Sequence, residues 1–174
     1  MAWPPTPLPI NFQNATVSLD THPTAHNTTN LQINNDIVPY INDRSTVKYA
    51  YRTSSQADIT SIVDIAGMTV TIPTQTGRLY RIVAQLELLS NVAGDVVTLY
   101  VTDSNNLQLT RATTKLAEIN TAETMVCTTL FAGGPGSKTI KLRAARVAGT
   151  GVALMFADPT TPALLSVEFL GPDN

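Results

Sequence analysis

The chain contains 174 residues, of which 43% are hydrophobic and only 14% are charged, and its formal net charge is −2 at pH 7. Soluble domains usually carry about 25% charged residues, so the low share here predicts a surface that neighbouring subunits partly cover. The near-neutral balance, without a basic patch, argues against a nucleic-acid partner. No apolar run approaches the roughly 20 residues of a membrane helix, so no membrane partner is expected.

The first segment, residues 1–18, predicts an extended, proline-rich arm. Its prolines disfavour a helix and favour polyproline geometry. They are Pro4, Pro5, Pro7 and Pro9. Four apolar side chains are the candidate anchors of this arm: Trp3, Leu8, Ile10 and Phe12. Two interpretations stay open, a floppy terminus or an arm that docks into a groove on a partner, which suits aromatic side chains on a low-entropy backbone.

Residues 19–43 predict a short helical linker with a thin apolar seam. Leu31, Val38 and Ile41 fall on one heptad stripe together with two asparagines. A helix of two or three turns is too short to be stable alone in water. The linker is therefore expected to pack either against copies of itself or on the body of its own subunit.

The linker also holds the candidate metal ligands Asp20, His22 and His26. The two histidines stand one helical turn apart, which is a spacing that metal sites use. They are the only imidazoles in the chain, so a metal would require several copies to meet at a symmetry axis. Ordinary capping and packing histidines are the favoured interpretation, and we expect neither a metal nor a cofactor.

Residues 44–174 predict an all-β domain. Roughly eight to ten short segments alternate apolar and polar residues, and turn residues separate them. This spacing of strands is typical of a β-sandwich or a jelly roll. The predicted fold is therefore all-β, a jelly-roll-like β-sandwich preceded by the extended arm and the short helical linker.

Two of these segments are apolar on both faces, which predicts that something covers the second face. A two-layer sandwich normally turns one face of each sheet towards water. Residues 79–89 add Leu79 and Val83 to their main apolar face. In residues 163–170, Leu165, Val167 and Phe169 share one face and Leu164 lies on the other. We expect these six residues to supply the trimer interface and the core.

No motif in the chain predicts an enzyme. The stretch "GGPGSKT" lacks the G-K-[ST] of a phosphate-binding loop, because Ser137 separates Gly136 from Lys138, and we interpret it as a hairpin loop. The single thiol, Cys127, lies in a strand pattern and is interpreted as buried and inert. No nucleophile with a base and no carboxylate pair stands out.

Three quoted stretches resemble known structural proteins. "HPTAHNTTN" resembles the N-terminal region of virion proteins from phages of actinobacteria, and "LLSVEFLGP" looks like the last strand of the same proteins. These proteins are called head fibre, capsid decoration or minor tail proteins. "GRLYRIVAQLELL" resembles the early core strand of trimeric jelly rolls similar to tumour necrosis factor and the complement head domain.

The resemblance implies a homotrimer bound to a virion, made in the cytoplasm of a bacterial host. Its expected partner is the major capsid protein of the phage, and a host surface glycan or protein stays open as a further partner. Capsid decoration, or a head fibre, is favoured because a tail fibre needs a long shaft of repeats and the chain has none. The alternative is a minor tail protein or a receptor-binding adhesin of a phage.

Overall fold

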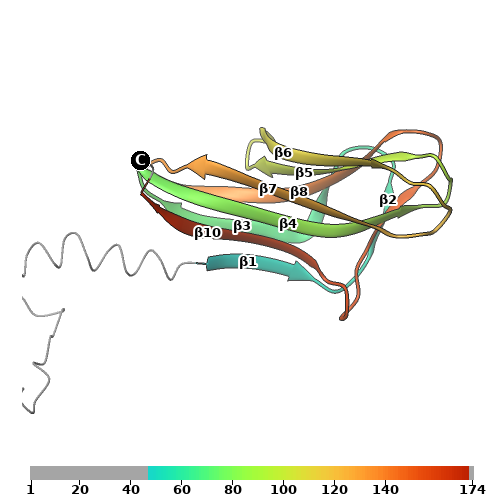
Figure 1. The fold of residues 1–174 in the computed structure, drawn as a ribbon, viewed down its shortest axis with the longest axis horizontal. Helices are drawn as coiled ribbons and strands as arrows, with labels where there is room; N and C mark the ends of the chain where they lie inside the picture. Colours follow the sequence, from blue (N-terminus) through green and yellow to red (C-terminus); the bar gives the residue numbers. More distant parts are fainter. Residues whose placement is uncertain (1–46, 173–174) are drawn as a thin grey trace, which may run out of the picture. The chain divides into compact units, whose positions relative to one another are not determined.

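The computed structural model describes residues 47–172, which form ten β-strands and no helix (Figure 1). The described residues belong to one compact unit. The predicted arm (1–18) and linker (19–43) lie outside the described residues. The same holds for their candidate residues Trp3, Leu8, Ile10, Phe12, Asp20, His22, His26, Leu31, Val38 and Ile41. These assignments therefore stay predictions.

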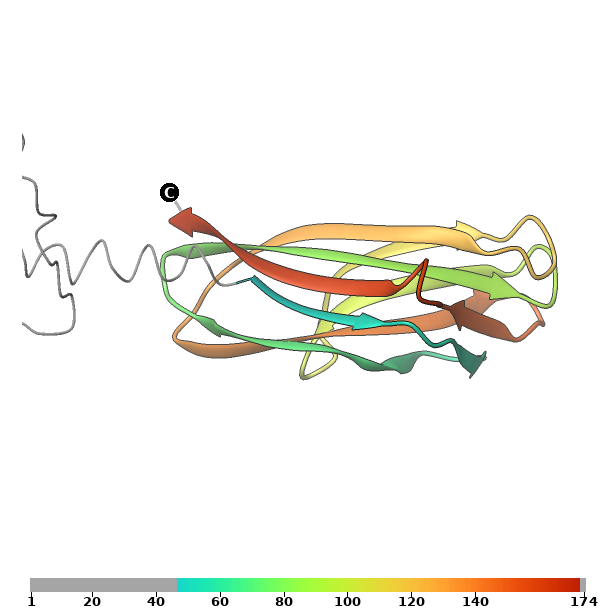
Figure 2. The same ribbon diagram turned by 90° about the horizontal axis from the view of Figure 1, so that it is seen from below.

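The strands form two sheets that face each other (Figures 1 and 2). The first sheet has six strands in the order β1-β10-β4-β9-β2, with β7 on the other edge of β4, and the second has four in the order β3-β8-β5-β6. The strands are β1 (Val47–Arg52), β2 (Gln56–Ile59), β3 (Val63–Thr74), β4 (Arg78–Ser90), β5 (Val96–Asp103), β6 (Gln108–Lys115), β7 (Glu123–Ala132), β8 (Gly136–Ala148), β9 (Ala153–Phe156) and β10 (Ala163–Pro172).

Strand β4 organises the first sheet because it is long enough to take three partners. β10 pairs with its first part and β9 with its last part along one edge, and β7 pairs with most of the other edge. We call the end of the body where β1 begins and β10 ends the base, and the opposite end, where β4 ends, the tip. All pairings in both sheets are antiparallel.

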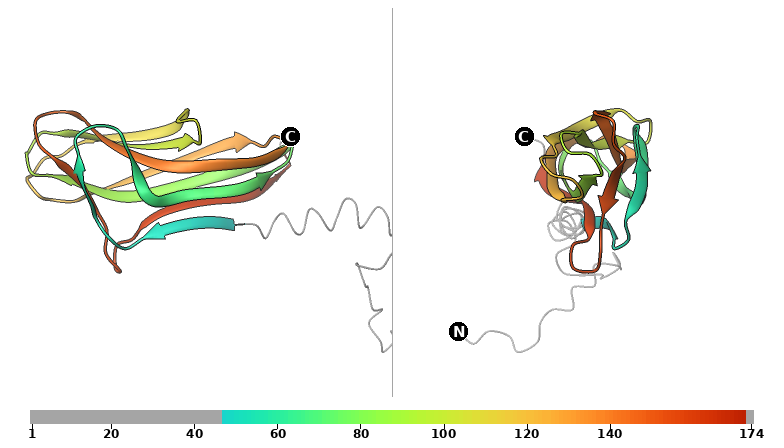
Figure 3. Two further views of the ribbon diagram at one scale, coloured as in Figure 1. Left: turned by 180° about the vertical axis from the view of Figure 1, so that it is seen from behind. Right: turned by 90° about the vertical axis from the view of Figure 1, so that its right-hand side faces the viewer.

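The core lies between the two sheets, whose strands are seen end-on in the right-hand view of Figure 3. Alternate residues of each central strand point inwards, because side chains in a strand alternate between its two faces. On β4 these are Tyr80, Ile82, Ala84, Leu86 and Leu88, and on β5 they are Val97, Leu99 and Val101. Burying a large aliphatic side chain contributes about 1.5–3 kcal/mol, so this interior is the main source of stability.

The loop after β7 corrects one prediction from the sequence. β7 lies in the first sheet and β8 in the second, so residues 133–135 cross between the sheets and the hairpin interpretation of "GGPGSKT" is wrong. The backbone N–H of Gly133 donates to the carbonyl oxygen of Arg78 over 2.7 Å. A Cβ at Gly133 would meet the carbonyl oxygen of Gln75 and lie 2.7 Å from the Tyr80 ring, so this crossing requires glycine.

Candidate functional site: the outer face of the first sheet

The outer face of the first sheet carries an unusual number of exposed apolar side chains. The most exposed are Tyr49 (64%), Tyr51 (62%), Val126 (54%), Leu130 (52%) and Val47 (49%). Half-buried aliphatic residues lie between them. We define the apolar face as these residues together with Leu79, Val83 and Leu164. A group of exposed apolar residues on one sheet face is typical of an interaction site, whereas exposed apolar residues that occur singly are normal on any protein.

The register of the strands explains why these residues share one surface. Tyr51 pairs with Leu164 on β10, which pairs with Gln85 on β4, which in turn pairs with Val126 on β7. This row crosses all four strands at one distance from the base. The next row towards the base holds Tyr49, Ser166, Val83 and Thr128 in the same way. Each row therefore combines aromatic, aliphatic and polar side chains, and none of these residues is charged.

One ion pair interrupts the apolar face. Arg81 on β4 and Glu168 on β10 are paired in the register, and their side chains form a salt bridge. Val47 and Leu130 flank the pair at the same level on β1 and β7. Since each charge already has its partner within the subunit, the pair can be covered by another apolar surface without leaving an unpaired charge.

The six residues predicted for interface and core divide between the two sides of the first sheet. Leu79, Val83 and Leu164 lie half-buried on the outer face. Leu165, Val167 and Phe169 lie buried among the core residues of their own subunit. The stacked pair Tyr49 and Tyr51, with ring centroids 6.2 Å apart, was not singled out from the sequence, although the alternation in "VKYAYR" places both rings on one face.

Strand β7 forms a long edge beside the apolar face. Among residues 47–172 it pairs with β4 only, so its other edge has no hydrogen-bonded strand. Between Glu123 and Ala132 it contains no charged residue. Natural proteins usually protect such an edge with charges, a bulge or a cover, because a bare edge invites pairing with another chain. Glu123, at the first position of β7, is the one charge that the described strand supplies.

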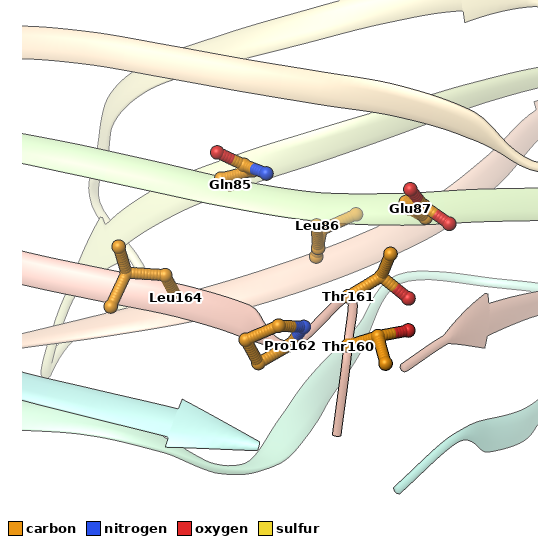
Figure 4. A pocket seen from close by; sticks show the side chains of 7 residues that line it. All are labelled: Gln85, Leu86, Glu87, Thr160, Thr161, Pro162 and Leu164. Carbon is orange, nitrogen blue, oxygen red and sulfur yellow. The ribbon is translucent and has the colours of Figure 1, made fainter. Parts of the chain in front are cut away.

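A pocket of ≈ 220 Å³ opens at the β9–β10 side of β4 (Figure 4). It is lined by Gln85, Leu86 and Glu87 of β4, by Leu164 of β10 and by Thr160–Pro162 of the loop before β10. Glu87 accepts a hydrogen bond from the hydroxyl of Thr124 over 3.3 Å. The pocket therefore adjoins the apolar face at the level of the row that contains Leu164.

Asp158 fixes the loop that closes this pocket. Its carboxylate oxygen Oδ1 accepts from the backbone N–H groups of Thr160 and Thr161, each over 2.7 Å, and from both of their hydroxyls. These bonds, led by that from the Thr160 hydroxyl, lower the pKa of Asp158 to about 2. The hydroxyl protons of the loop are thus already used, and these hydroxyls can only accept further hydrogen bonds.

The outer face of the second sheet is polar by comparison. Asp64 accepts from the side chains of Lys141 (3.0 Å) and Arg143 (2.7 Å), and the Lys141 hydrogen bond is the main reason that the pKa of Asp64 is lowered. Thr71 and Thr139, which are both on this face, share a hydroxyl–hydroxyl hydrogen bond of 2.8 Å across β3 and β8. This face has the character of a surface that stays in contact with water.

A buried carboxylate joins the two sheets at the tip. Asp95 accepts from the hydroxyl of Ser90 over 2.6 Å and from the backbone N–H of Thr150 over 3.1 Å, and it is almost fully buried. The Ser90 hydrogen bond is the largest of the causes that lower the pKa of Asp95. A Cβ on Gly149 or Gly151 would collide with the Asp95 carboxylate, so both glycines allow this close approach.

The described residues show no group suited to hold a metal. Within residues 47–172 no three His, Cys, Asp or Glu side chains cluster as ligands would. Cys127 is buried, as its strand pattern predicted, and burial raises the pKa of its thiol to about 11. The same part of the chain contains no helix that is long and apolar enough to cross a membrane.

Comparisons with known proteins agree at the level of the fold. No protein-family model and no curated protein sequence matches the chain. Similar solved structures include Eiger TNF from S. frugiperda, with 10% identity and a TM-score of 0.47 over 74% of this chain and 94% of that one. They also include the crystal structure of murine APRIL at pH 5.0, with 11% identity and a TM-score of 0.50 over 72% of this chain and 100% of that one. The second similarity, with the strand order, confirms the predicted jelly-roll sandwich.

Proposed function

We propose that this chain is a structural protein of a phage virion, which decorates the capsid as a homotrimer and stabilises the capsid lattice. The observation that carries the proposal is the contrast between the apolar outer face of the first sheet and the polar outer face of the second. The resemblance of "HPTAHNTTN" and "LLSVEFLGP" to phage structural proteins supports the virion as its location. The likeness of "GRLYRIVAQLELL" to trimeric jelly rolls supports three copies.

The first step of the mechanism is assembly of the body. Three copies turn their apolar faces towards a common axis and cover Tyr49, Tyr51 and Val83 from water. Each square ångström of apolar surface that is covered contributes about 25 cal/mol. Permanent interfaces of this type commonly bury more than about 2,000 Å² and are apolar. The apolar face fits this description, because the ion pair on it, Arg81 with Glu168, forms within one subunit.

The second step is attachment to the capsid. The apolar face runs along the strands, so an axis that gathers three such faces runs parallel to the strands and brings the three bases together. The chain enters β1 at the base, and each arm therefore joins the trimer at the same end. Trp3 and Phe12 would dock into the capsid, and three weak contacts held together act as one tight contact through their effective concentration.

The third step is reinforcement of the lattice. A trimer whose three arms reach different copies of the major capsid protein ties those copies together. The polar faces, with Asp64 and its two basic partners, then point outwards into solvent. Synthesis in the cytoplasm of the bacterial host, followed by binding to the assembled capsid, completes the proposal.

The first test is the mass of the full chain in solution, by light scattering from micromolar to nanomolar concentration. The proposal predicts a mass of three chains that persists on dilution. A monomer at every concentration, with or without capsids, would contradict the trimer.

The second test is binding to purified capsids that lack the protein. Deletion of residues 2–18 is expected to abolish sedimentation with the capsids and to leave the trimer mass unchanged. Ile119→Ser is the control. Ile119 is exposed at the tip and belongs neither to the arm nor to the apolar face, so this variant should still bind capsids as a trimer. Capsid binding by the deleted chain would refute the arm as anchor. Binding to host cells in place of capsids would favour the tail protein or adhesin.

A further inference from the structure

We propose that Val126 of one copy inserts into the pocket between β4 and the Thr160–Pro162 loop of the next copy. This inference rests on the trimer of the proposed function and names the contact that sets its register. It concerns two features that the described subunit leaves open: an exposed valine on a strand whose outer edge has no hydrogen-bonded partner, and an adjoining pocket that its own side chains do not fill.

The argument begins with the two flanks of the apolar face. In a ring of three identical copies, each copy presents one flank to the copy before it and the other flank to the copy after it. β7 forms one flank. The pocket lies on the opposite side of β4, beside β10 and β9, where β1 ends at Arg52 as the strand beyond β10. Contact between neighbours therefore brings the β7 flank of one copy against the pocket flank of the next.

The level of each feature along the strands selects the partner residue. Rotation about an axis parallel to the strands keeps every residue at the same distance from the base. Val126 pairs with Gln85, and Gln85 itself lines the pocket. Val126 and the pocket are thus at the same level. Leu130, the next large exposed residue on the β7 flank, pairs with Arg81 and lies about 13 Å nearer the base, at about 3.3 Å per residue.

The chemistry of the pocket fits an aliphatic side chain. Pro162 and Leu164 contribute apolar lining beside the polar Gln85 and Glu87, and the hydroxyls of Thr160 and Thr161 already donate to Asp158. Val126 is half exposed in the single subunit, so its transfer into the pocket removes apolar surface from water. The β7 edge is covered in the same step, which removes the bare strand as a site for unwanted pairing.

Engineered disulfides test the contact. The full chain with Cys127→Ala, Val126→Cys and Thr161→Cys is expected to give covalent trimers on a denaturing gel after mild oxidation. Val126 and Thr161 flank β4 on opposite sides, about two strand spacings or roughly 10 Å apart, so a bond within one chain exceeds the roughly 7 Å limit for a disulfide. The matched control, Cys127→Ala with Leu130→Cys and Thr161→Cys, is expected to stay uncrosslinked.

Mixing chains that carry only one of the two new cysteines sharpens the result. Co-refolded Val126→Cys and Thr161→Cys chains are expected to yield covalent dimers, whereas either chain alone yields none. If light scattering shows a trimer but only the Leu130 pair crosslinks, or neither pair does, the inference is wrong and the trimer stands. A monomeric mass for the unmodified chain overturns both proposals.

Discussion

The outer faces of the two sheets differ although they belong to the same sandwich. The first sheet exposes tyrosines and aliphatic residues, and the charged side chains of Arg81 and Glu168 on this face pair with each other. The second sheet exposes threonines and the cluster of Asp64, Lys141 and Arg143. Both sheets bury equally apolar inner faces, so the core does not require the difference. The contrast is the basis of our proposal that the first face contacts protein and the second stays in contact with water.

The largest effect is expected from a change on the inner side of β10. Val167→Asp places a charge without a partner in the core, where Val167 is fully buried, and should cost more than about 4 kcal/mol of unfolding free energy. Most domains are stable by only about 5–15 kcal/mol, so the variant should be largely unfolded. Urea unfolding followed by circular dichroism measures this.

The neighbouring residue supplies the control for that experiment. Ser166→Asp lies on the outer side of the same strand and should keep the fold while weakening the trimer. A folded, trimeric Val167→Asp protein would show that Val167 does not lie on the core side of β10.

The comparison itself is tested by adding the same charge to each outer face. Val83→Glu on the first sheet is expected to raise the trimer dissociation constant by at least about 100-fold, since a buried unpaired charge costs about 3–5 kcal/mol. Thr69→Glu on the second sheet, opposite Lys141, should leave the mass at three chains. Equal loss of trimer in both variants would mean that the two faces do not differ in role. Light scattering on dilution measures both.

A smaller effect is expected at the tip, where neither outer face is involved. Because the Ser90 hydrogen bond holds the pKa of Asp95 below its ordinary 3.8, the ionised carboxylate stabilises the fold above pH 3.8, and this stability is lost as pH falls through the lowered pKa. Asp95→Asn should lose about 1–3 kcal/mol near neutral pH and show a weaker loss below about pH 4 than the parent. Acid titration monitored by circular dichroism is the measurement; an unchanged acid transition would assign it to other carboxylates.

The smallest effect is expected within the polar face. Asp64→Asn removes two ion pairs, but an exposed pair usually contributes only about 0–1 kcal/mol because water and salt screen it. Its lowered pKa adds a stabilising contribution that is likewise lost only as pH falls below 3.8. Thermal unfolding at low and high salt should show a small difference that salt removes. A loss that salt leaves unchanged would indicate packing rather than charge.

Strand periodicity was sufficient to predict the sandwich and the division of each strand into two faces. Alternation placed Leu165 and Val167 on one face of β10 and Leu164 on the other, and the structure keeps that division. Periodicity could not say which of two apolar sides met the subunit's own core, because both sides read as hydrophobic. The crossing at Gly133 was missed for a related reason: a turn signal marks a change of direction and carries no information on which sheet follows.

The interface candidates show a second limit of the sequence. Val126 and Leu130 alternate with polar residues in a strand whose inner side holds Met125 and Cys127, so this pattern alone does not reveal an exposed apolar edge. The pocket at Thr160 depends on a loop returning to β4 from far along the chain. Such juxtapositions follow from topology and register, which local propensity does not specify.

The position of β10 has a consequence for how the body forms during synthesis. β10 lies between β1, the first strand of the body, and β4, and it contributes Leu165, Val167 and Phe169 to the interior. The first sheet therefore cannot close while residues 163–172 are still inside the ribosome, and the emerged strands expose unpaired edges until then. Contacts between such distant parts of a chain form slowly. The nascent body thus remains open to wrong partners until its last strand has been made.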